Sequence, residues 1–166
     1  MLIGRQWISD HIPHKGNMLL LDCVERWDDE QILCIASSHR SASNPLRVGG
    51  RLGAVCSVEY AAQAMAVHDA LVWKKRGDGP QVAGAGYIAS VRELCMEITR
   101  LDDIDGDLAV SATRLAAHSS LLYNFVISTD RRMLVKGRII IFVEPDALEN
   151  SQSPESVAAK QEAPDV

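Results

Sequence analysis

Residues 53–79 read GAVCSVEYAAQAMAVHDALVWKKRGDG, and this stretch decides the fold. Its apolar side chains recur at the spacing of an α-helix and cover almost the whole circumference. Three cations, Lys74, Lys75 and Arg76, stand where they oppose the helix dipole at the carboxyl end, and Gly77 suits the residue that ends a helix. A helix that is apolar nearly all round is enclosed by the rest of its protein. The stretch therefore predicts one long, central, buried helix.

Stretches that favour β-strands lie on both sides of this helix. A short capped turn around residues 9–14 comes first, and two strands joined by a turn at residues 28–30 form a hairpin. Residues 41–53, rich in Ser, Asn, Pro and Gly, form a loop before the helix. The strands are expected over residues 18–27, 31–39, 82–94, 107–117, 121–129 and 133–143. A long antiparallel sheet wrapped around one helix satisfies this order, so we predict an α+β hot-dog fold, which normally dimerises.

The length and the charge of the chain indicate one domain followed by a tail. A chain of 166 residues suits a single domain with its own core. Residues 145–166 are polar and acidic, so we expect a hot-dog domain over residues 1–144 and a disordered tail over residues 145–166. Residues 144–166 hold six acidic side chains against one lysine, which accounts for the net charge of -5. The body is then neutral, and such a surface argues against a nucleic-acid partner.

Other sequence features exclude further classes of protein. No apolar run approaches the roughly 20 residues of a membrane span, and the amino terminus lacks the pattern of a signal peptide, so we expect a cytoplasmic protein. The four cysteines are scattered without CxxC or CxxH spacing. We therefore expect them at apolar core positions, with no disulfide framework and no metal site.

Glu59 is the first residue that does not fit a purely structural helix. It lies between Val58 and Tyr60 inside the apolar stretch, and Gln63 follows four residues later on the same face. A buried carboxylate is costly unless it is paired, and burial would raise its pKa toward the range useful in a general acid or base. The alternative is that Glu59 lies at the edge of the helix and contacts solvent.

Two histidines before the first long strand, His11 and His14, are the second such feature. Imidazole titrates near neutral pH and often carries protons in catalysis. The alternative for both is a surface position in a turn, and it is the stronger interpretation for His11. His68 lies nine residues after Glu59, nearly on the opposite face of the helix, and is expected to be structural, whereas His39 and His118 are expected to be solvated at strand ends.

These two places coincide with two motifs of a known family. Residues 12–22, IPHKGNMLLLD, resemble the LPHRxPxLLxD opening of bacterial 3-hydroxyacyl-ACP dehydratases. Residues 59–63, EYAAQ, resemble the ExxAQ start of the central helix in the same family. The wording VEYAAQAMAVH at residues 58–68 is more similar to a divergent branch, the dehydratase-like proteins of aryl-polyene gene clusters. The resemblance covers about residues 12–144.

The resemblance implies a dimer of hot-dog chains with an active site at the dimer interface. The implied substrate is a 3-hydroxyacyl thioester on acyl carrier protein or coenzyme A, and no metal or organic cofactor is implied. In the family a histidine takes the α-proton and an acid on the helix protonates the leaving hydroxyl. Glu59 falls on that acid and Gln63 on its supporting glutamine, while the backbone near Gly49, Gly50 and Gly53 falls where N–H groups would polarise the thioester carbonyl.

One element of the family pattern has no counterpart in this chain. The family's loop histidine would fall at Asn44-Pro45-Leu46, and no histidine lies between Arg40 and His68. Three interpretations follow: His14 replaces the missing base in a dehydratase, the chain is a hot-dog thioesterase, or it is a non-catalytic acyl-binding subunit beside an active partner. The dimer is then expected with itself or with a related hot-dog chain. Basic side chains that could meet an acidic carrier protein are Arg40, Arg47, Arg51, Lys74, Lys75 and Arg76, although ordinary solvated charge explains them equally well.

Overall fold

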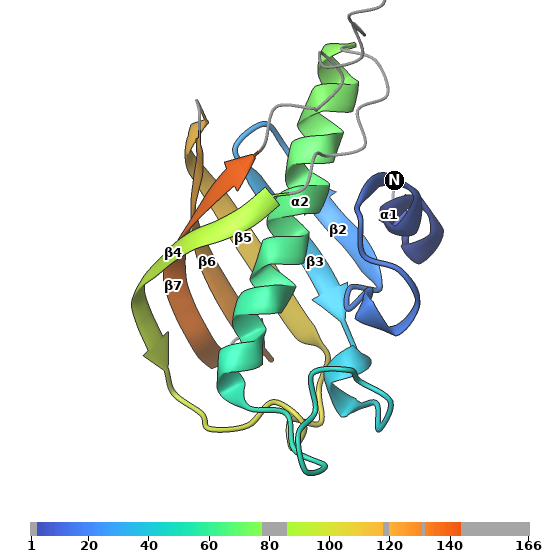
Figure 1. Ribbon diagram of the computed structural model, residues 1–166, viewed down its shortest axis with the longest axis vertical. Coiled ribbons are helices and arrows are strands. Elements are labelled where there is room, and N and C mark those ends of the chain that lie inside the picture. The colour runs from blue at the N-terminus through green and yellow to red at the C-terminus, as the bar shows by residue number, and fades with distance from the viewer. Residues whose placement is uncertain (1–2, 78–85, 118–119, 131, 144–166) are drawn as a thin grey trace, which may run out of the picture.

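A computed structural model describes residues 3–77, 86–117, 120–130 and 132–143. Its main elements are one long helix, α2 (Ser57–Arg76), and a seven-stranded sheet in the order β1-β2-β3-β5-β6-β7-β4, in which neighbouring strands run antiparallel. The strands are β1 (Ile3–Gly4), β2 (Cys23–Trp27), β3 (Gln31–Ala36), β4 (Gly86–Met96), β5 (Leu108–Ala117), β6 (Ser120–Thr129) and β7 (Arg132–Val143). α2 crosses one face of this sheet (Figure 1). The predicted hot-dog architecture is confirmed.

The period-two pattern of the strands gives the sheet its buried face. In β3, buried Ile32, Cys34 and Ala36 alternate with more accessible residues, and β5 repeats this alternation from Leu108 onward. Successive side chains of a strand point to opposite faces, so one face of the sheet is apolar and packs against α2. α2 contributes Tyr60, Ala61, Ala64, Met65, Val67 and Leu71 to this core.

α2 ends where the sequence predicts. Gly77 has a φ of 79° and donates its backbone N–H to the carbonyl of Lys74 at 3.3 Å. This left-handed conformation is accessible to glycine at little cost, so the chain leaves the helix there. The helix is less enclosed than we expected: Val58, Ala62 and Ala66 are only partly buried, and Trp73, near its end, is 38% exposed. The sheet covers one side of α2, and a stripe of the other side stays accessible in this single chain.

The structure corrects the sequence prediction at the amino terminus. Residues 9–14, expected as a turn, belong partly to a helix, α1 (Arg5–His11), and the first long strand begins at Cys23 rather than at Met18. Residues 18–22 instead continue from a single 3₁₀ turn, η1 (Gly16–Met18), as an extended segment between α1 and α2. Two further 3₁₀ turns, η2 (Ser38–Arg40) and η3 (Ala54–Cys56), flank the loop before α2.

Other predictions have mixed outcomes. All four cysteines are free thiols, but only Cys34 is fully buried, because the other three lie on the less covered parts of their elements. The predicted tail over residues 145–166 lies outside the described residues, as do the start of the strand expected at 82–94 and His118. Among the described helices, none is long and apolar enough to cross a membrane.

Candidate active site

Glu59 lies in the first turn of α2 beside the segment that precedes η1. Its Oε1 is 3.0 Å from Nε2 of His14, and the two side chains are 27% and 26% exposed. Pro13 is exposed on the segment leading from α1 to η1, and His14 reaches from that segment back to the helix. A carboxylate and an imidazole in hydrogen-bonding contact, both partly open to solvent, form a pair that can exchange protons with a ligand.

Gln63 lies one turn after Glu59 and is completely buried. Its Oε1 accepts a hydrogen bond from the backbone N–H of Leu20 at 2.9 Å, and its Nε2 donates to the carbonyl of Met18 at 2.8 Å. The same Nε2 donates to Oε1 of Glu59 at 2.9 Å. The orientation of the amide is therefore fixed by the backbone of residues 18–20, and the helix glutamine offers Glu59 a donor rather than an acceptor.

The hydrogen bonds at Glu59 decide its charge state. Burial acts to raise the pKa of Glu59, but the hydrogen bonds from His14 and Gln63, with the attraction of the imidazole, together lower that pKa below its usual value. The raised pKa expected from the sequence is thus wrong for this chain, because burial alone ignores the two donors. Glu59 is ionised at neutral pH, with both donors on Oε1, and no hydrogen bond from the described residues reaches Oε2.

The donor role of His14 follows from its surroundings. Nε2 faces the Glu59 carboxylate, whereas Nδ1 is buried and has no hydrogen-bond partner among the described residues. An imidazole with its hydrogen on Nε2 satisfies this arrangement, because Nδ1 then needs no acceptor. His14 therefore acts as a donor to Glu59 in this structure.

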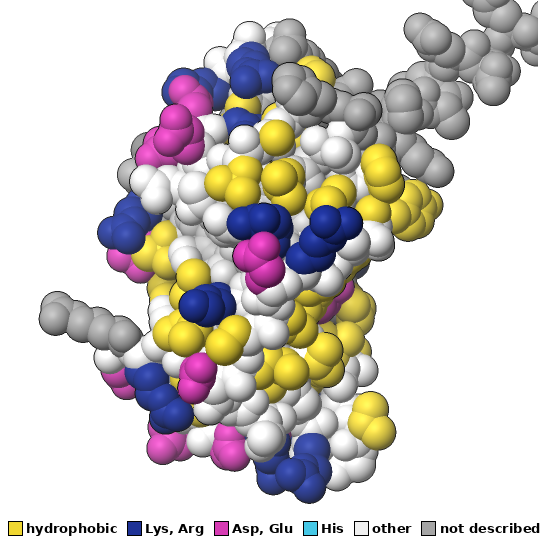
Figure 2. All heavy atoms as spheres, turned by 90° about the vertical axis from the view of Figure 1, so that its left-hand side faces the viewer, with side chains coloured by type: hydrophobic (Ala, Val, Ile, Leu, Met, Phe, Trp, Pro, Cys, Tyr) yellow, Lys and Arg dark blue, Asp and Glu magenta, His cyan; other side chains and the backbone are white. Residues whose placement is uncertain are grey.

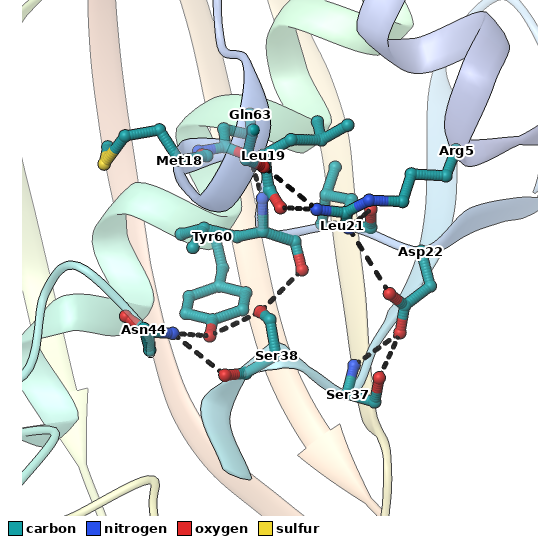
Figure 3. Close-up of polar contacts among 12 residues, drawn as sticks. Arg5, Met18, Leu19, Leu21, Asp22, Ser37, Ser38, Asn44, Tyr60 and Gln63 are labelled. Carbon is teal, nitrogen blue, oxygen red and sulfur yellow. Dashed lines mark hydrogen bonds and ion pairs between the residues drawn. The ribbon is translucent and has the colours of Figure 1, made fainter. Parts of the chain in front are cut away.

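A second polar network lies beneath the pair and includes the residue next to Glu59. The Tyr60 hydroxyl lies 2.9 Å from Oγ of Ser38 and accepts a hydrogen bond from Nδ2 of Asn44 at 3.0 Å. Ser38 in turn donates to the carbonyl of Leu20 at 2.7 Å, so Tyr60 supplies the proton between the two hydroxyls. Figure 3 shows this chain of contacts from the loop before α2 to the segment beside Gln63. Burial raises the pKa of Tyr60, which keeps the hydroxyl protonated.

The model of the ApeP-like family, described as ApeP dehydratase, matches residues 6–152 of the chain. The chain belongs to the ApeP-like dehydratase family. This match covers α1 from its second residue, η1 and the whole of α2, and therefore includes every residue of the pair and of the network beneath it. Among curated protein sequences, none matches the chain.

Solved structures give the fold of this ApeP-like chain independently. The dehydratase heterocomplex ApeI:P from Xenorhabdus doucetiae is similar with a TM-score of 0.74 and 21% identity, over 86% of this chain and 93% of that chain. Zebra fish thioesterase superfamily member 2 matches with a TM-score of 0.57 and 12% identity, over 84% of this chain and 95% of that chain. A hypothetical thioesterase from Streptococcus pneumoniae, solved with coenzyme A, has a TM-score of 0.50 and 10% identity, over 73% and 84% of the two chains. These likenesses show a shared fold.

The loop before α2, where the dehydratases that the sequence resembles carry a histidine, holds Asn44 in this chain. Asn44 is buried and both ends of its side-chain amide are bound: Nδ2 donates to the Tyr60 hydroxyl on α2 and to the carbonyl of Ser38, and Oδ1 accepts from the backbone N–H of Leu46. Gly49 and Gly50 lie at the exposed tip of a two-residue turn closed by mutual hydrogen bonds of Val48 and Arg51. No described hydrogen bond joins these glycines or Gly53 to Glu59, so their role at a thioester carbonyl stays a prediction.

The other described histidines are bound elsewhere in the fold. His11 stacks on Trp7 and bonds its carbonyl at 2.8 Å, and buried His68 bonds the Tyr123 hydroxyl at 2.9 Å. Burial lowers the pKa of His68, which suits the structural role expected for it. The prediction that His39 is solvated is wrong, because His39 is completely buried and its ring bonds the carbonyl of Ile104. His14 is thus the imidazole that the described chain brings to Glu59.

Three of the six basic residues predicted as a possible carrier surface form ion pairs. Arg40 binds Asp107 at 2.6 Å, Arg47 lies 3.6 Å from Asp102, and Lys75 binds Asp29 at 2.7 Å. Lys74 lies over the ring of Trp7. Ion pairing weakens the field of Arg40, Arg47 and Lys75, whereas no ion pair within the described residues involves Arg51, Lys74 or Arg76. The sequence did not point to Tyr60 or Ser38, and only the position of Tyr60 beside Glu59 could have indicated one of them.

Proposed function

We propose that this ApeP-like chain dehydrates a 3-hydroxyacyl thioester, carried by acyl carrier protein, to the trans-2-enoyl thioester. The single observation that carries the proposal is the contact of 3.0 Å between His14 and Glu59 at the accessible side of α2. The family match supports a dehydratase, and the contact supplies the acid–base group that a dehydratase needs.

In this proposal, Oε2 of Glu59 carries out the proton transfers. Oε1 of Glu59 already accepts hydrogen bonds from His14 and Gln63, which leaves Oε2 to face a substrate. The ionised carboxylate takes the α-proton from C2, and the electron pair moves toward the thioester carbonyl. The double bond between C2 and C3 then forms as the C3–O bond breaks, and Oε2 returns the proton to the leaving hydroxyl, which departs as water. His14 stabilises the carboxylate before and after this cycle.

The thioester carbonyl needs donors of its own in this scheme. Backbone N–H groups near Gly49, Gly50 and Gly53 are proposed for that role, since this loop leads directly into α2 two turns before Gln63. An acyl carrier protein is preferred over coenzyme A as the carrier because the family resemblance is to carrier-dependent dehydratases. The assay below includes both carriers.

A second hot-dog chain is proposed to complete the site, bound along β4. This strand pairs only with β7 in the described sheet, so its other edge offers free backbone groups. Figure 2 shows apolar side chains, interrupted by cations, over the side of the molecule that carries β4 and β7. The exposed apolar residues there are Tyr87, Ile88, Val91, Met96 and Phe142. The Xenorhabdus doucetiae structure is a heterocomplex, which supports a related but different chain as the partner.

Mass spectrometry tests the proposed reaction. A purified chain, alone and with candidate hot-dog partners, is incubated with 3-hydroxyacyl-ACP or 3-hydroxyacyl coenzyme A, and loss of one water from the acyl group is followed. Glu59→Gln should reduce the rate at least a hundredfold, and His14→Ala should reduce it less because Oε2 remains. Arg26→Ala, on the exposed part of β2, is the matched control. Equal loss in the two site variants would instead favour His14 as a separate base.

A thioesterase is the second candidate. The lowered pKa of Glu59 favours it, because an ionised carboxylate with a free oxygen can also activate water for attack on a thioester. The same assay separates the two reactions, since a thioesterase releases free acid and leaves the hydroxyl in place. No turnover with any partner would favour a non-catalytic subunit.

A further inference from the structure

The extended segment after η1 is held from two opposite sides. From α2, Gln63 binds the carbonyl of Met18 and the N–H of Leu20. From α1, Arg5 donates to the carbonyls of Leu19 at 2.6 Å and Leu21 at 2.9 Å. Figure 3 shows the guanidinium and the Gln63 amide on either side of this backbone. The segment that supplies the partners of Gln63, and that follows His14 through η1, is therefore held by one side chain from each helix.

The alternating direction of the backbone carbonyls explains why side chains on both sides are needed to hold the segment. In an extended chain, successive carbonyls point to opposite sides. Met18 therefore turns its carbonyl toward α2, while Leu19 and Leu21 turn theirs toward α1. Gln63 alone would fix one edge of the segment and leave the other edge free to rotate. Arg5 fixes that second edge, and its Nη2 also donates to the carbonyl of Gly16 at 3.2 Å, two residues after His14.

Arginine is suited to this position by its shape. Its planar guanidinium presents five donors in a fixed fork, which a single lysine ammonium cannot reproduce across three carbonyls. The Asp22 carboxylate lies 3.5 Å from Nη1 of Arg5 and accepts hydrogen bonds from the backbone N–H and the hydroxyl of Ser37, both at 2.6 Å. The fork is thus oriented from β2 and from the end of β3. The side chain of Arg5 is 44% exposed, so its removal opens no cavity in the core.

We infer that Arg5 is a positioning residue for the pair: through the carbonyls of Gly16, Leu19 and Leu21 it holds His14 and Gln63 at Oε1 of Glu59. This inference rests on the proposed function only for its effect on the rate. Its structural consequence is independent of the reaction, because release of the segment loosens both hydrogen bonds to Glu59.

Two readouts follow from this role. The hydrogen bonds from His14 and Gln63 are what hold the pKa of Glu59 down against burial. Arg5→Ala should therefore raise the pKa of Glu59, and it should lower kcat by roughly ten- to a hundredfold with little change in KM, as expected when a reacting group is misplaced. Arg5→Lys should produce the same changes to a smaller extent, since the charge remains and the fork is lost.

The experiment follows the side-chain carboxyl carbon of Glu59 by ¹³C NMR during a pH titration of the full-length chain. The signal is identified by its absence in Glu59→Gln, and Arg26→Ala is the control for removal of an exposed arginine. The positioning role is supported if the pKa of Glu59 is higher in Arg5→Ala and in Arg5→Lys, and if this pKa in Arg26→Ala equals that of the unchanged chain. If Arg5→Ala does not fold, Arg5→Lys decides alone.

The failure of each proposal is visible separately. If both Arg5 variants titrate at Glu59 like the unchanged chain, the positioning role is overturned whatever their activity. If the unchanged chain removes no water from any 3-hydroxyacyl thioester, with or without partner, the proposed function fails, and the titration still decides the role of Arg5. A higher KM with kcat unchanged would also overturn the positioning role, because such an effect would place Arg5 at the substrate rather than behind the pair.

Discussion

Replacing Gln63 with leucine isolates what the buried amide contributes. Leucine has a similar size, so the change removes hydrogen bonds without opening a large cavity. It leaves the N–H of Leu20 and the carbonyl of Met18 without their partner from α2. Each buried backbone group left unsatisfied costs about 1–3 kcal/mol, and the Met18 carbonyl, which is only partly buried, stands at the lower end. The variant should therefore lose about 3 kcal/mol of unfolding free energy.

Thermal unfolding measures this loss. For a chain of this size, about 3 kcal/mol lowers Tm by roughly 6–12 °C. Samples must be compared at one protein concentration, because association with a second chain would stabilise the folded state by mass action. The matched control is Gln6→Leu on α1, where an exposed amide binds Asp10 at 3.0 Å and contributes only about 0.2–0.5 kcal/mol.

The result that would refute the reasoning is equally specific. A Gln63→Leu variant that melts within about 2 °C of the Gln6→Leu control would show that the segment after η1 does not depend on the amide, by the conversion used above. The argument that Arg5 and Gln63 together hold this segment from opposite sides would then lose its support from Gln63.

Three further predictions concern other parts of the molecule. Tyr60→Phe removes the hydroxyl between Asn44 and Ser38 and should cost about 1–2 kcal/mol in urea unfolding, whereas no change would show that the network is dispensable. The lowered pKa of Glu59 stabilises the folded state above the ordinary glutamic acid pKa of about 4.3, and this stability is lost as pH falls through the lower folded value. The advantage of the unchanged chain over Glu59→Gln should thus shrink in acid unfolding measurements, and a constant difference would contradict the assignment. Val91→Asp on β4 should abolish association in analytical ultracentrifugation and leave circular dichroism unchanged; retained association would exclude this edge.

The sequence predicts the architecture because its strongest signals are periodic. The apolar helix ending at Gly77 and the strands with period two are local patterns that burial on one face imposes. The amino terminus was predicted poorly for a physical reason. Residues 18–22 have the composition of a strand, but the carbonyls of residues 18–21 bind side chains of Arg5, Ser38 and Gln63. A backbone hydrogen bond to β3 begins only at Asp22, whose N–H donates to the carbonyl of Ile35.

The candidate site divides in the same way. Glu59 and Gln63 could be found from sequence because polar residues stand out in an apolar helix, and His14 because of the motif around it. The charge state of Glu59 could not be predicted from the sequence, since it depends on two donors that converge on one oxygen atom. Arg5 gave no signal either, because its partners are backbone carbonyls, which any sequence supplies.

The position of Asn44 links the missing loop histidine to the pair at Glu59. Both ends of its side-chain amide are engaged, with the Tyr60 hydroxyl and the Ser38 carbonyl on one side and the Leu46 N–H on the other. A residue so bound has no free group for proton transfer, and its loop is tied to the helix that carries Glu59. The loop that supplies a base in the resembled dehydratases thus serves here as a support. The proton transfer proposed for this chain is therefore assigned to the pair of Glu59 and His14, which lies beside the segment held between Arg5 and Gln63.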